Sequence, residues 1–313
     1  MAKYWAFRIA AAVVPRMPFG VARRLAAALG VAIWALAGSA RRRAERNLAH
    51  LPGLAAEPER RRHAARGVFV TMALNYLDFL RGHRLSDAEL KANWSIENQD
   101  AFDAAMAQGR GLILISGHFG NFEFAASRLG AMGYRLIIPA ERMRPEALYQ
   151  LFRRLREHHS LRIVPADSRE SLRELLDALK RNEVVMFMAD RYVDGSSVEV
   201  PFFGEPARLP TAPMALALKS GAPVMTAYSW REGAGHSHGI FIPLDVGNAQ
   251  PRTSESRPAT SGDERAATAT RARARGSDAT VRAIGVFVTQ LERQIEAHPE
   301  QWVSALLHVW KEG

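Results

Sequence analysis

The sequence predicts an α/β fold with a mainly parallel central sheet flanked by helices. Between residues 111 and 189, short apolar runs of strand length alternate with segments of helical periodicity. Strands that alternate with helices in this way usually pair in parallel, because each helix returns the chain to the same end of the sheet. A hydrophobic content of 48% over 313 residues is enough for one large core.

The stretch 111–123 is predicted to form the central strand, a tight turn and the start of a helix. Leu112–Ile115 is a continuous apolar run, which is typical of a strand buried on both faces. Gly117 and Gly120 then allow a tight turn, and helical spacing of apolar residues begins after Asn121. His118 and Glu123 are therefore expected on a strand–turn–helix crossover at the carboxyl end of a strand, where open α/β sheets place their chemistry.

Two further strand ends carry acidic residues. The pattern predicts strands over 134–139, 161–165 and 183–189, separated by helices over 145–157 and 168–180. Glu141 follows the first of these strands, and Asp190 follows the last. Because parallel strands end at one edge of the sheet, His118, Glu141 and Asp190 are expected to converge.

A histidine beside a carboxylate can act as a general base. The carboxylate accepts a hydrogen bond from one ring nitrogen, and the other nitrogen is then free to take a proton. The chain has no Cys and no Gly-x-Ser-x-Gly elbow, so the proton taken by His118 would come from the substrate. The alternatives are a histidine that caps a turn, and ordinary surface ion pairs for Glu141 with Arg156 and for Asp190 with Arg191.

The excess charge lies at the N-terminal end. Residues 1–66 contain 13 Lys/Arg and 3 Asp/Glu, which accounts for the whole net charge of +10. Residues 25–40 form an uncharged run between Arg23-Arg24 and Arg41-Arg42-Arg43, shorter than the roughly 20 residues of a full span. We therefore expect residues 1–43 to form helices that lie in or dip into a membrane leaflet. A buried core helix is the alternative.

The rest of the chain, 44–313, is expected to form a single α/β domain. Helices are predicted over 57–80, 214–219 and 281–297, with a short helix capped at Ser86 and a last helix starting at Pro299. Residues 101–108 lead into the central strand and end at Gly109. Late strands are predicted over 198–203, 222–228 and 239–244. Residues 247–280 are nearly free of large apolar side chains and are predicted to be disordered.

Composition also argues against several classes of protein. Without Cys there are no disulfides, thiolate metal sites or thiol nucleophiles. The histidine pairs at 158–159 and at 236 and 238 lack suitably spaced acidic partners, so no metal is expected. No nucleic-acid-binding signature accompanies the basic end, so an anionic lipid surface or an acidic carrier protein is expected as its partner.

The motif Gly-His-Phe-Gly-Asn-Phe-Glu at 117–123 resembles the histidine, four residues, acidic residue motif of the bacterial late acyltransferases. This family includes the lipid A (Kdo-lipid) acyltransferases and the phosphatidylinositol mannoside acyltransferases. The resemblance continues through the segments 138–142, 153–156, 188–191, 200–210, 217–224 and 298–302. It covers most of the chain from about Arg43 onward, except residues 247–280.

The resemblance implies a lysophospholipid acyltransferase-like fold and transfer of a fatty acyl chain from a thioester to a glycolipid hydroxyl. His118 would be the general base and Glu123 its orienting partner. Glu141, Arg156 and Asp190 would support the site, together with Gly117, Gly120 and Asn121, whose backbone N–H groups would stabilise an oxyanion. Phe202, Phe203, Thr211 and Met214 would line the pocket for the acyl chain and the acceptor.

The resemblance also implies the partners and the place of action. The donor would be acyl-CoA or an acyl carrier protein thioester, with no cofactor, and the chain would act as a monomer at the cytoplasmic face of the inner membrane. The acceptor, a lipid A precursor or a phosphatidylinositol mannoside, stays open. The alternatives are a lipid-acting hydrolase and a catalytically silent protein that binds membrane surfaces.

Overall fold

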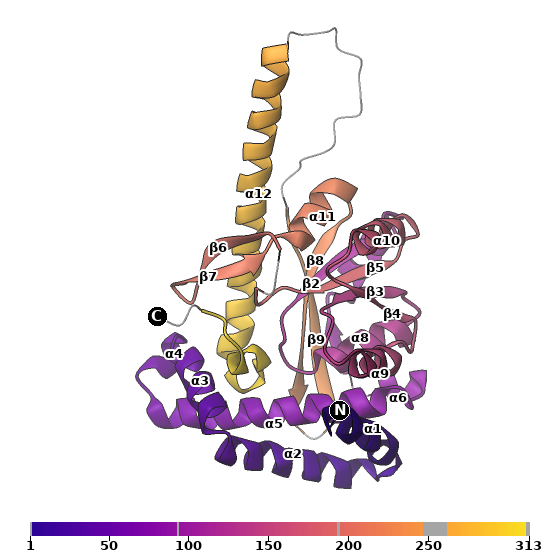
Figure 1. The fold of residues 1–313 in the computed structure, drawn as a ribbon, viewed down its shortest axis with the longest axis vertical. Coiled ribbons are helices and arrows are strands. Elements are labelled where there is room, and N and C mark those ends of the chain that lie inside the picture. Colours follow the sequence, from indigo (N-terminus) through magenta and orange to yellow (C-terminus); the bar gives the residue numbers. More distant parts are fainter. Residues whose placement is uncertain (1, 93, 193–194, 234, 247–261, 311–313) are drawn as a thin grey trace.

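A computed structural model describes residues 2–92, 94–192, 195–233, 235–246 and 262–310. Its centre is a seven-stranded sheet in the order β1-β9-β8-β2-β5-β3-β4 (Figure 1). β8, β2, β5, β3 and β4 are parallel, and β9 and β1 run the other way. The predicted α/β class with a mainly parallel sheet is confirmed. The strands are β1 (Trp94–Glu97), β2 (Leu112–Ser116), β3 (Leu136–Ala140), β4 (Leu161–Pro165), β5 (Val184–Met188), β8 (Val224–Glu232) and β9 (His236–Pro243).

Alternate residues of the central strand face two different helical layers. In β2, Leu112 and Leu114 face α7 (Gln99–Met106) and α8 (Phe122–Ala131). Ile113 and Ile115 face the opposite layer, which contains α10 (Arg169–Lys180), α11 (Ala212–Ser220) and α12 (Gly262–Ala297). All five residues of β2 are buried, as expected for a strand covered on both faces.

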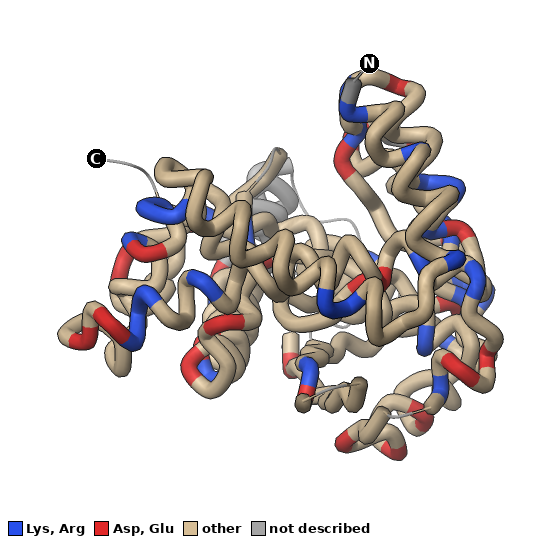
Figure 2. Tube along the Cα trace, turned by 90° about the horizontal axis from the view of Figure 1, so that it is seen from below, with Lys and Arg blue, Asp and Glu red and all other residues tan. Residues whose placement is uncertain are grey.

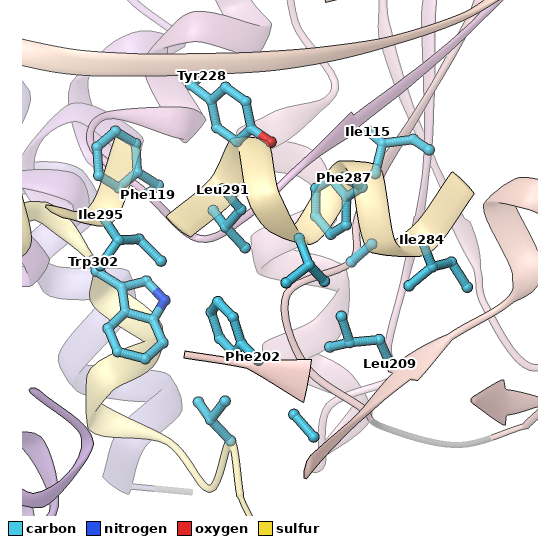
Figure 3. Packing of buried hydrophobic residues seen from close by; sticks show 14 of the residues in the cluster. Ile115, Phe119, Phe202, Leu209, Tyr228, Ile284, Phe287, Leu291, Ile295 and Trp302 are labelled. Carbon is cyan, nitrogen blue, oxygen red and sulfur yellow. The ribbon is translucent and has the colours of Figure 1, made fainter. Parts of the chain in front are cut away.

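The apolar face of α12 fills the centre of the larger layer. Ile284, Phe287, Leu291 and Ile295 follow helical spacing and are all nearly inaccessible to solvent. Figure 3 shows them pointing from one face of α12 toward Phe202 and neighbouring core side chains. α12 begins at Gly262, so the segment predicted to be disordered is helical from this residue onward. Its many Ala and Arg residues have high helix propensity, and residues 247–261 lie outside the described residues.

A separate two-stranded hairpin packs against α12. It consists of β6 (Ser197–Phe202) and β7 (Glu205–Pro210), paired antiparallel. The sequence predicted β6 but not β7, because the pattern at Gly204, Glu205 and Pro206 predicts a turn. The strand starts within this turn, and the edge of a hairpin tolerates proline. The final helix predicted from Pro299 is replaced by two 3₁₀ turns, Pro299–Gln301 and Val303–Leu306.

Helices cover the edge at which the parallel strands end. α5 (Pro58–Gly82) crosses this edge, and α2 (Phe19–Leu36) lies along it on the outer side (Figure 1). The two approach closely at Gly30, where a Cβ atom would lie 2.7 Å from the Val70 Cα atom. The other helices are α1 (Ala2–Val13), α3 (Gly38–Leu48), α4 (Pro52–Ala55), α6 (Asp87–Lys91) and α9 (Glu146–Arg156), with a 3₁₀ turn at Val14–Arg16.

The outer face of α1 and α2 is apolar and exposed. Among the described residues, nine of the thirteen large hydrophobic side chains that are exposed belong to residues 5–36. In α2 they recur along one stripe, while Ala22 and Gly30 are buried against the body. By length and composition α2 is also able to cross a membrane. Figure 2 views the molecule from this side, with basic positions spread along the helices. The exposed residues of the stripe are Val21, Leu25, Leu29, Ile33 and Leu36.

Candidate active site

The histidine of the central motif lies at the carboxyl edge of the sheet and pairs with Asp190. β2 and β5 are parallel with Ser116 opposite Met188, so two residues further on His118 comes opposite Asp190. The His118 Nδ1 atom lies 2.8 Å from Asp190 Oδ1, and the His118 backbone N–H donates to Oδ2 at 2.9 Å. The predicted convergence of strand ends is confirmed for these two side chains.

The electrostatics of the pair favour a charged aspartate. Asp190 is fully buried, and burial alone would raise its pKa. The neighbouring His118 charge and the hydrogen bonds from His118 outweigh burial and lower the pKa of Asp190 below its ordinary value. A carboxylate can only accept, so Nδ1 carries the proton and donates it. Nε2 forms no hydrogen bond with any residue that the structure describes, and the His118 side chain is 24% exposed.

Glu123 does not contact the His118 ring nitrogens. It lies in the first turn of α8 and faces α9, where its carboxylate accepts two hydrogen bonds from Arg156, one of them from Nε at 3.1 Å. The structure therefore assigns the orienting position, which the sequence analysis gave to Glu123, to Asp190. The reason is geometric: β5 borders β2 directly, whereas Glu123 starts a helix that turns away from the strand end.

Arg156 is held between the charge of Glu123 and two aromatic rings. Its guanidinium lies 5.4 Å from the Phe79 ring centroid and 5.8 Å from that of Phe152. Burial alone would lower the pKa of Arg156, but the Glu123 charge and its hydrogen bonds raise it above the ordinary value. Arg156 therefore remains a cation, and it does not contact Glu141 as the sequence analysis considered.

Glu141 pairs instead with Arg191. The Arg191 Nη2 atom donates to Glu141 Oε2 at 3.3 Å, and the Glu141 side chain is 59% exposed. Glu141 and Asp190 thus follow the ends of two strands, as predicted, and β3 and β5 are neighbours in the sheet. Of the two, only Asp190 forms a hydrogen bond with the histidine.

The backbone N–H groups of residues 118–121 donate to acceptors within the protein. The N–H of Gly120 donates to the Gln301 carbonyl at 2.8 Å, and that of Asn121 to the Ser229 carbonyl at 3.3 Å. Phe119 N–H donates to the Gly117 carbonyl at 2.7 Å. The N–H groups of Gly120 and Asn121 are therefore not free to stabilise an oxyanion, which corrects the expectation from the sequence for these two residues.

Gly120 is the residue that fixes the shape of this turn. It has φ +59°, and a Cβ atom there would lie 1.7 Å from the Ser229 carbonyl oxygen. No side chain fits this position, and the left-handed backbone favours glycine. Gly117 lies against Asp190, where a Cβ atom would approach its Cβ to 3.1 Å.

A polar clamp that the sequence analysis missed holds the turn against α5. Asn75 Nδ2 donates to the Gly120 carbonyl at 2.8 Å, and Arg231 Nη2 donates to Asn75 Oδ1 at 2.6 Å. Arg231 also pairs with Asp78 at 2.5 Å, and its backbone N–H donates to Gln301 Oε1 at 2.9 Å. The available signal was an asparagine within the apolar stripe of a helix, since a buried amide needs specific partners.

The side chain of Asn121 ties the start of α8 to the sheet. It is buried, accepts from Ser229 Oγ at 2.5 Å and donates to Ser237 Oγ at 2.8 Å. Asn121 thus connects α8 to both β8 and β9. This contact is structural, because both polar atoms of the amide are occupied by protein groups.

The residues expected to line an acyl pocket lie elsewhere. Phe202 and Met214 are buried in the core, and Phe203 occupies the β6–β7 turn, where its N–H donates to Glu292. Thr211 precedes α11 and bonds the Ser196 carbonyl at 3.2 Å. None of the four lines either of the two cavities described below.

A small apolar cavity lies next to the histidine instead. It is enclosed between α8 and the sheet, and one of its walls is Phe122, whose ring centroid is 5.3 Å from that of His118. Its volume is about 20 Å³, which is room for about one water molecule. In this conformation it is too small to hold an acyl chain.

The fold and the site together define an α/β protein with a histidine–aspartate pair at the sheet edge, beneath exposed apolar helices. The family described as bacterial lipid A biosynthesis acyltransferase matches residues 1–312. The chain therefore belongs to this family, as the motif resemblance predicted.

Curated relatives add a more specific likeness. The chain is 37% identical over 148 residues to phosphatidylinositol mannoside acyltransferases of two Mycobacterium tuberculosis strains, CDC 1551 / Oshkosh and H37Rv. It is 33% identical over 145 residues to the protein of that name from Mycolicibacterium smegmatis. The aligned segments cover 46–47% of this chain and 47–48% of the relatives, so the chain matches about half of their length.

Proposed function

We propose that the protein is an O-acyltransferase that moves a fatty acyl chain from a thioester to a hydroxyl group of a membrane glycolipid. The observation that carries the proposal is the His118–Asp190 pair. Its geometry leaves Nε2 as the free basic nitrogen at the edge of the sheet. Family membership and the names of the relatives support the same class of reaction.

In the proposed reaction the acceptor hydroxyl is the nucleophile. His118 Nε2 takes its proton as the oxygen attacks the thioester carbonyl carbon, and Asp190 stabilises the resulting imidazolium. The tetrahedral intermediate then collapses, the C–S bond breaks, and the thiolate leaves and receives the proton from His118. An ester forms and a free thiol is released, with no covalent acyl-protein intermediate.

The acceptor class that we propose is a phosphatidylinositol mannoside. The curated relatives carry this name, and the exposed apolar stripe of α2 borders the same edge of the sheet as His118. A lipid substrate needs its reactive sugar at the histidine while its acyl chains stay in the leaflet. We place the protein at the cytoplasmic face of the plasma membrane, where acyl-CoA and acyl carrier protein thioesters are found.

The test supplies the purified chain with acyl-CoA or an acyl carrier protein thioester, and with vesicles that contain either a phosphatidylinositol mannoside or a lipid A precursor. Mass spectrometry should detect an acceptor heavier by one acyl group. The His118→Ala variant should lose this product, whereas His63→Ala, at an exposed position on α5, should retain it. Release of free fatty acid alone would indicate a hydrolase, and no product with any acceptor would indicate a silent binding protein.

A further inference from the structure

A second cavity lies across the first turn of α8 from the histidine. Its volume is about 340 Å³, and it is enclosed by α2, α5, α6, α8 and the joined ends of β8 and β9. Asn121 and Phe124 line it, whereas Phe122 and Glu123 of the same turn face His118 and Arg156. The cavity is therefore separate from the proposed catalytic site, although it opens at the same edge of the sheet.

Positive charge dominates the walls of this cavity. Arg23, Arg81 and Arg231 line it, and only Arg231 forms an ion pair with a carboxylate within the described part of the chain. Arg23 donates to the Gly233 carbonyl at 3.0 Å. Arg81 donates to two backbone carbonyls, at Val14 and Met17. Carbonyls satisfy donors but leave the charge uncompensated, so these two guanidinium groups favour an anion.

A fourth arginine lies behind the wall. Arg128 is 99% buried and donates to the carbonyls of Leu90 and Ala92, and its guanidinium is 5.1 Å from the ring centroid of Phe124. Its Nη1 atom has no hydrogen-bond partner among the described residues.

The acidic residues leave an excess of positive charge. Glu89 also lines the cavity and is bonded to Ser86, and Asp78 is bonded to Arg231. Three guanidinium groups thus line the cavity, with that of Arg128 behind its wall, against two carboxylates.

We propose that this cavity binds the phosphate-bearing headgroup of an anionic phospholipid. Guanidinium groups suit phosphate because they offer several N–H donors in a fixed plane. A volume of about 340 Å³ lies within the usual range for small-molecule sites, roughly 300–1,000 Å³. The site does not depend on the acyl transfer proposed above, because none of its residues contacts His118.

The position of the cavity favours a lipid over a free anion. Phe19 forms part of its rim and belongs to the exposed apolar face of α1 and α2. If that face lies on a leaflet, the cavity opens at the level of the headgroups, and the acyl chains of a bound lipid would pass Phe19. A bound headgroup would also hold α2 to the β8–β9 turn, since Arg23 bridges the two.

The first test uses a water-soluble headgroup, glycerophosphoinositol, with the full chain and measures binding by calorimetry. Arg23→Gln keeps a donor for Gly233 but removes the charge, and should weaken binding about tenfold, the effect of losing one strong charged contact. Arg24→Gln is the matched control, since Arg24 is exposed and does not line the cavity. Arg24→Gln should change the dissociation constant for glycerophosphoinositol by less than about twofold.

A second pair of variants tests the cavity without touching an arginine. Ala92 is exposed, lines the cavity and has an extended backbone, so Ala92→Glu and Ala92→Gln place groups of the same shape there. The carboxylate should abolish binding of glycerophosphoinositol, and the amide should largely retain it. Equal effects of Glu and Gln would overturn the proposal, as would no binding by the unmodified chain.

Two further experiments distinguish a lipid headgroup from a free phosphate ion as the ligand. Inorganic phosphate should bind more weakly than glycerophosphoinositol; equal affinity would mean an anion site without lipid recognition, against the proposal. Vesicles of phosphatidylcholine with and without phosphatidylinositol give the preference for anionic lipid. Arg23→Gln should lose more of this preference than Arg24→Gln, and equal losses would show a diffuse surface charge instead of a site.

Discussion

Asp190 accepts two hydrogen bonds from His118, one from the ring at 2.8 Å and one from the backbone at 2.9 Å. Both depend on the register of two parallel strands, since His118 and Asp190 stand two residues beyond the pair Ser116 and Met188. The sheet itself therefore fixes the distance between the histidine that we propose as the general base and the carboxylate bonded to its ring.

The first prediction separates the two acidic candidates. Asp190→Asn keeps the shape but removes the carboxylate that selects the Nδ1–H tautomer, so kcat should fall by about 10²-fold or more. Glu123→Gln leaves the His118–Asp190 pair intact and should lower kcat less. Both are measured with vesicle-borne acceptor, and thermal unfolding of each variant serves as the control for folding. A larger loss for Glu123→Gln would assign the orienting role to Glu123 after all.

The second prediction concerns pH. The pKa of Asp190 is lowered in the folded protein, so its charged form stabilises the fold at pH values above its unfolded pKa of about 3.9. This contribution is lost as the pH falls through the lower, folded pKa. In urea unfolding, the difference in free energy between the unmodified chain and Asp190→Asn should be largest near neutral pH and shrink in acid. A difference that does not change with pH would contradict the assignment.

The third prediction addresses the pair of Glu123 and Arg156. Glu123→Gln or Arg156→Gln leaves the other charge partly buried without a partner. Each variant should therefore lower the free energy of unfolding by more than the ion pair itself contributes. A double-mutant cycle should give a coupling of about 1–3 kcal/mol. The exposed pair of Glu141 and Arg191 is the control, and its coupling should be about 0–1 kcal/mol. Equal couplings for the two pairs would show that burial at Arg156 has no energetic effect.

The fourth prediction uses two glycines with similar backbones. Gly109 and Gly120 have φ +70° and +59°, but a Cβ atom at Gly109 meets nothing within 4 Å, while at Gly120 it collides with Ser229. Gly109→Ala should therefore cost only the backbone strain, about 1–2 kcal/mol. Gly120→Ala should cost several times more and abolish transfer, as judged by chemical unfolding and activity. Similar losses at both positions would mean that the turn can relax.

The sequence was sufficient to place the strand ends but not their side-chain partners. Parallel pairing follows from alternating strands and helices, so the short distance between His118 and Asp190 could be predicted from the sequence. The contact between Glu123 and Arg156 was not, because it joins α8 to α9 across 33 residues and depends on how the two helices pack. The same holds for the clamp of Asn75 and Arg231, which are 156 residues apart.

The composition of residues 262–279 predicted a different local structure from the one observed. Few large apolar residues between 262 and 279 predicted disorder, yet α12 continues back to Gly262. Ala279, Ala283, Ile284 and Phe287 bury one face of the described part of the helix against the core, and the sequence before them is rich in residues of high helix propensity. Burial of one part of a helix can therefore support regular structure in a neighbouring part.

The last prediction tests the membrane face with two adjacent residues of α2. Leu29 is 57% exposed on the apolar stripe, whereas Gly30 is buried against the backbone at Val70. Leu29→Ser should leave the unfolding temperature almost unchanged, because the side chain contacts little of the body. It should weaken binding to phosphatidylcholine vesicles by about 1–2 kcal/mol, the value of a partly buried leucine. Gly30→Val should do the reverse: the added side chain pushes α2 away from α5 and lowers the unfolding temperature. Vesicle flotation and thermal unfolding of both variants separate the two effects. If Leu29→Ser lowers stability and leaves vesicle binding intact, the stripe is a protein contact surface and α2 does not lie on the membrane.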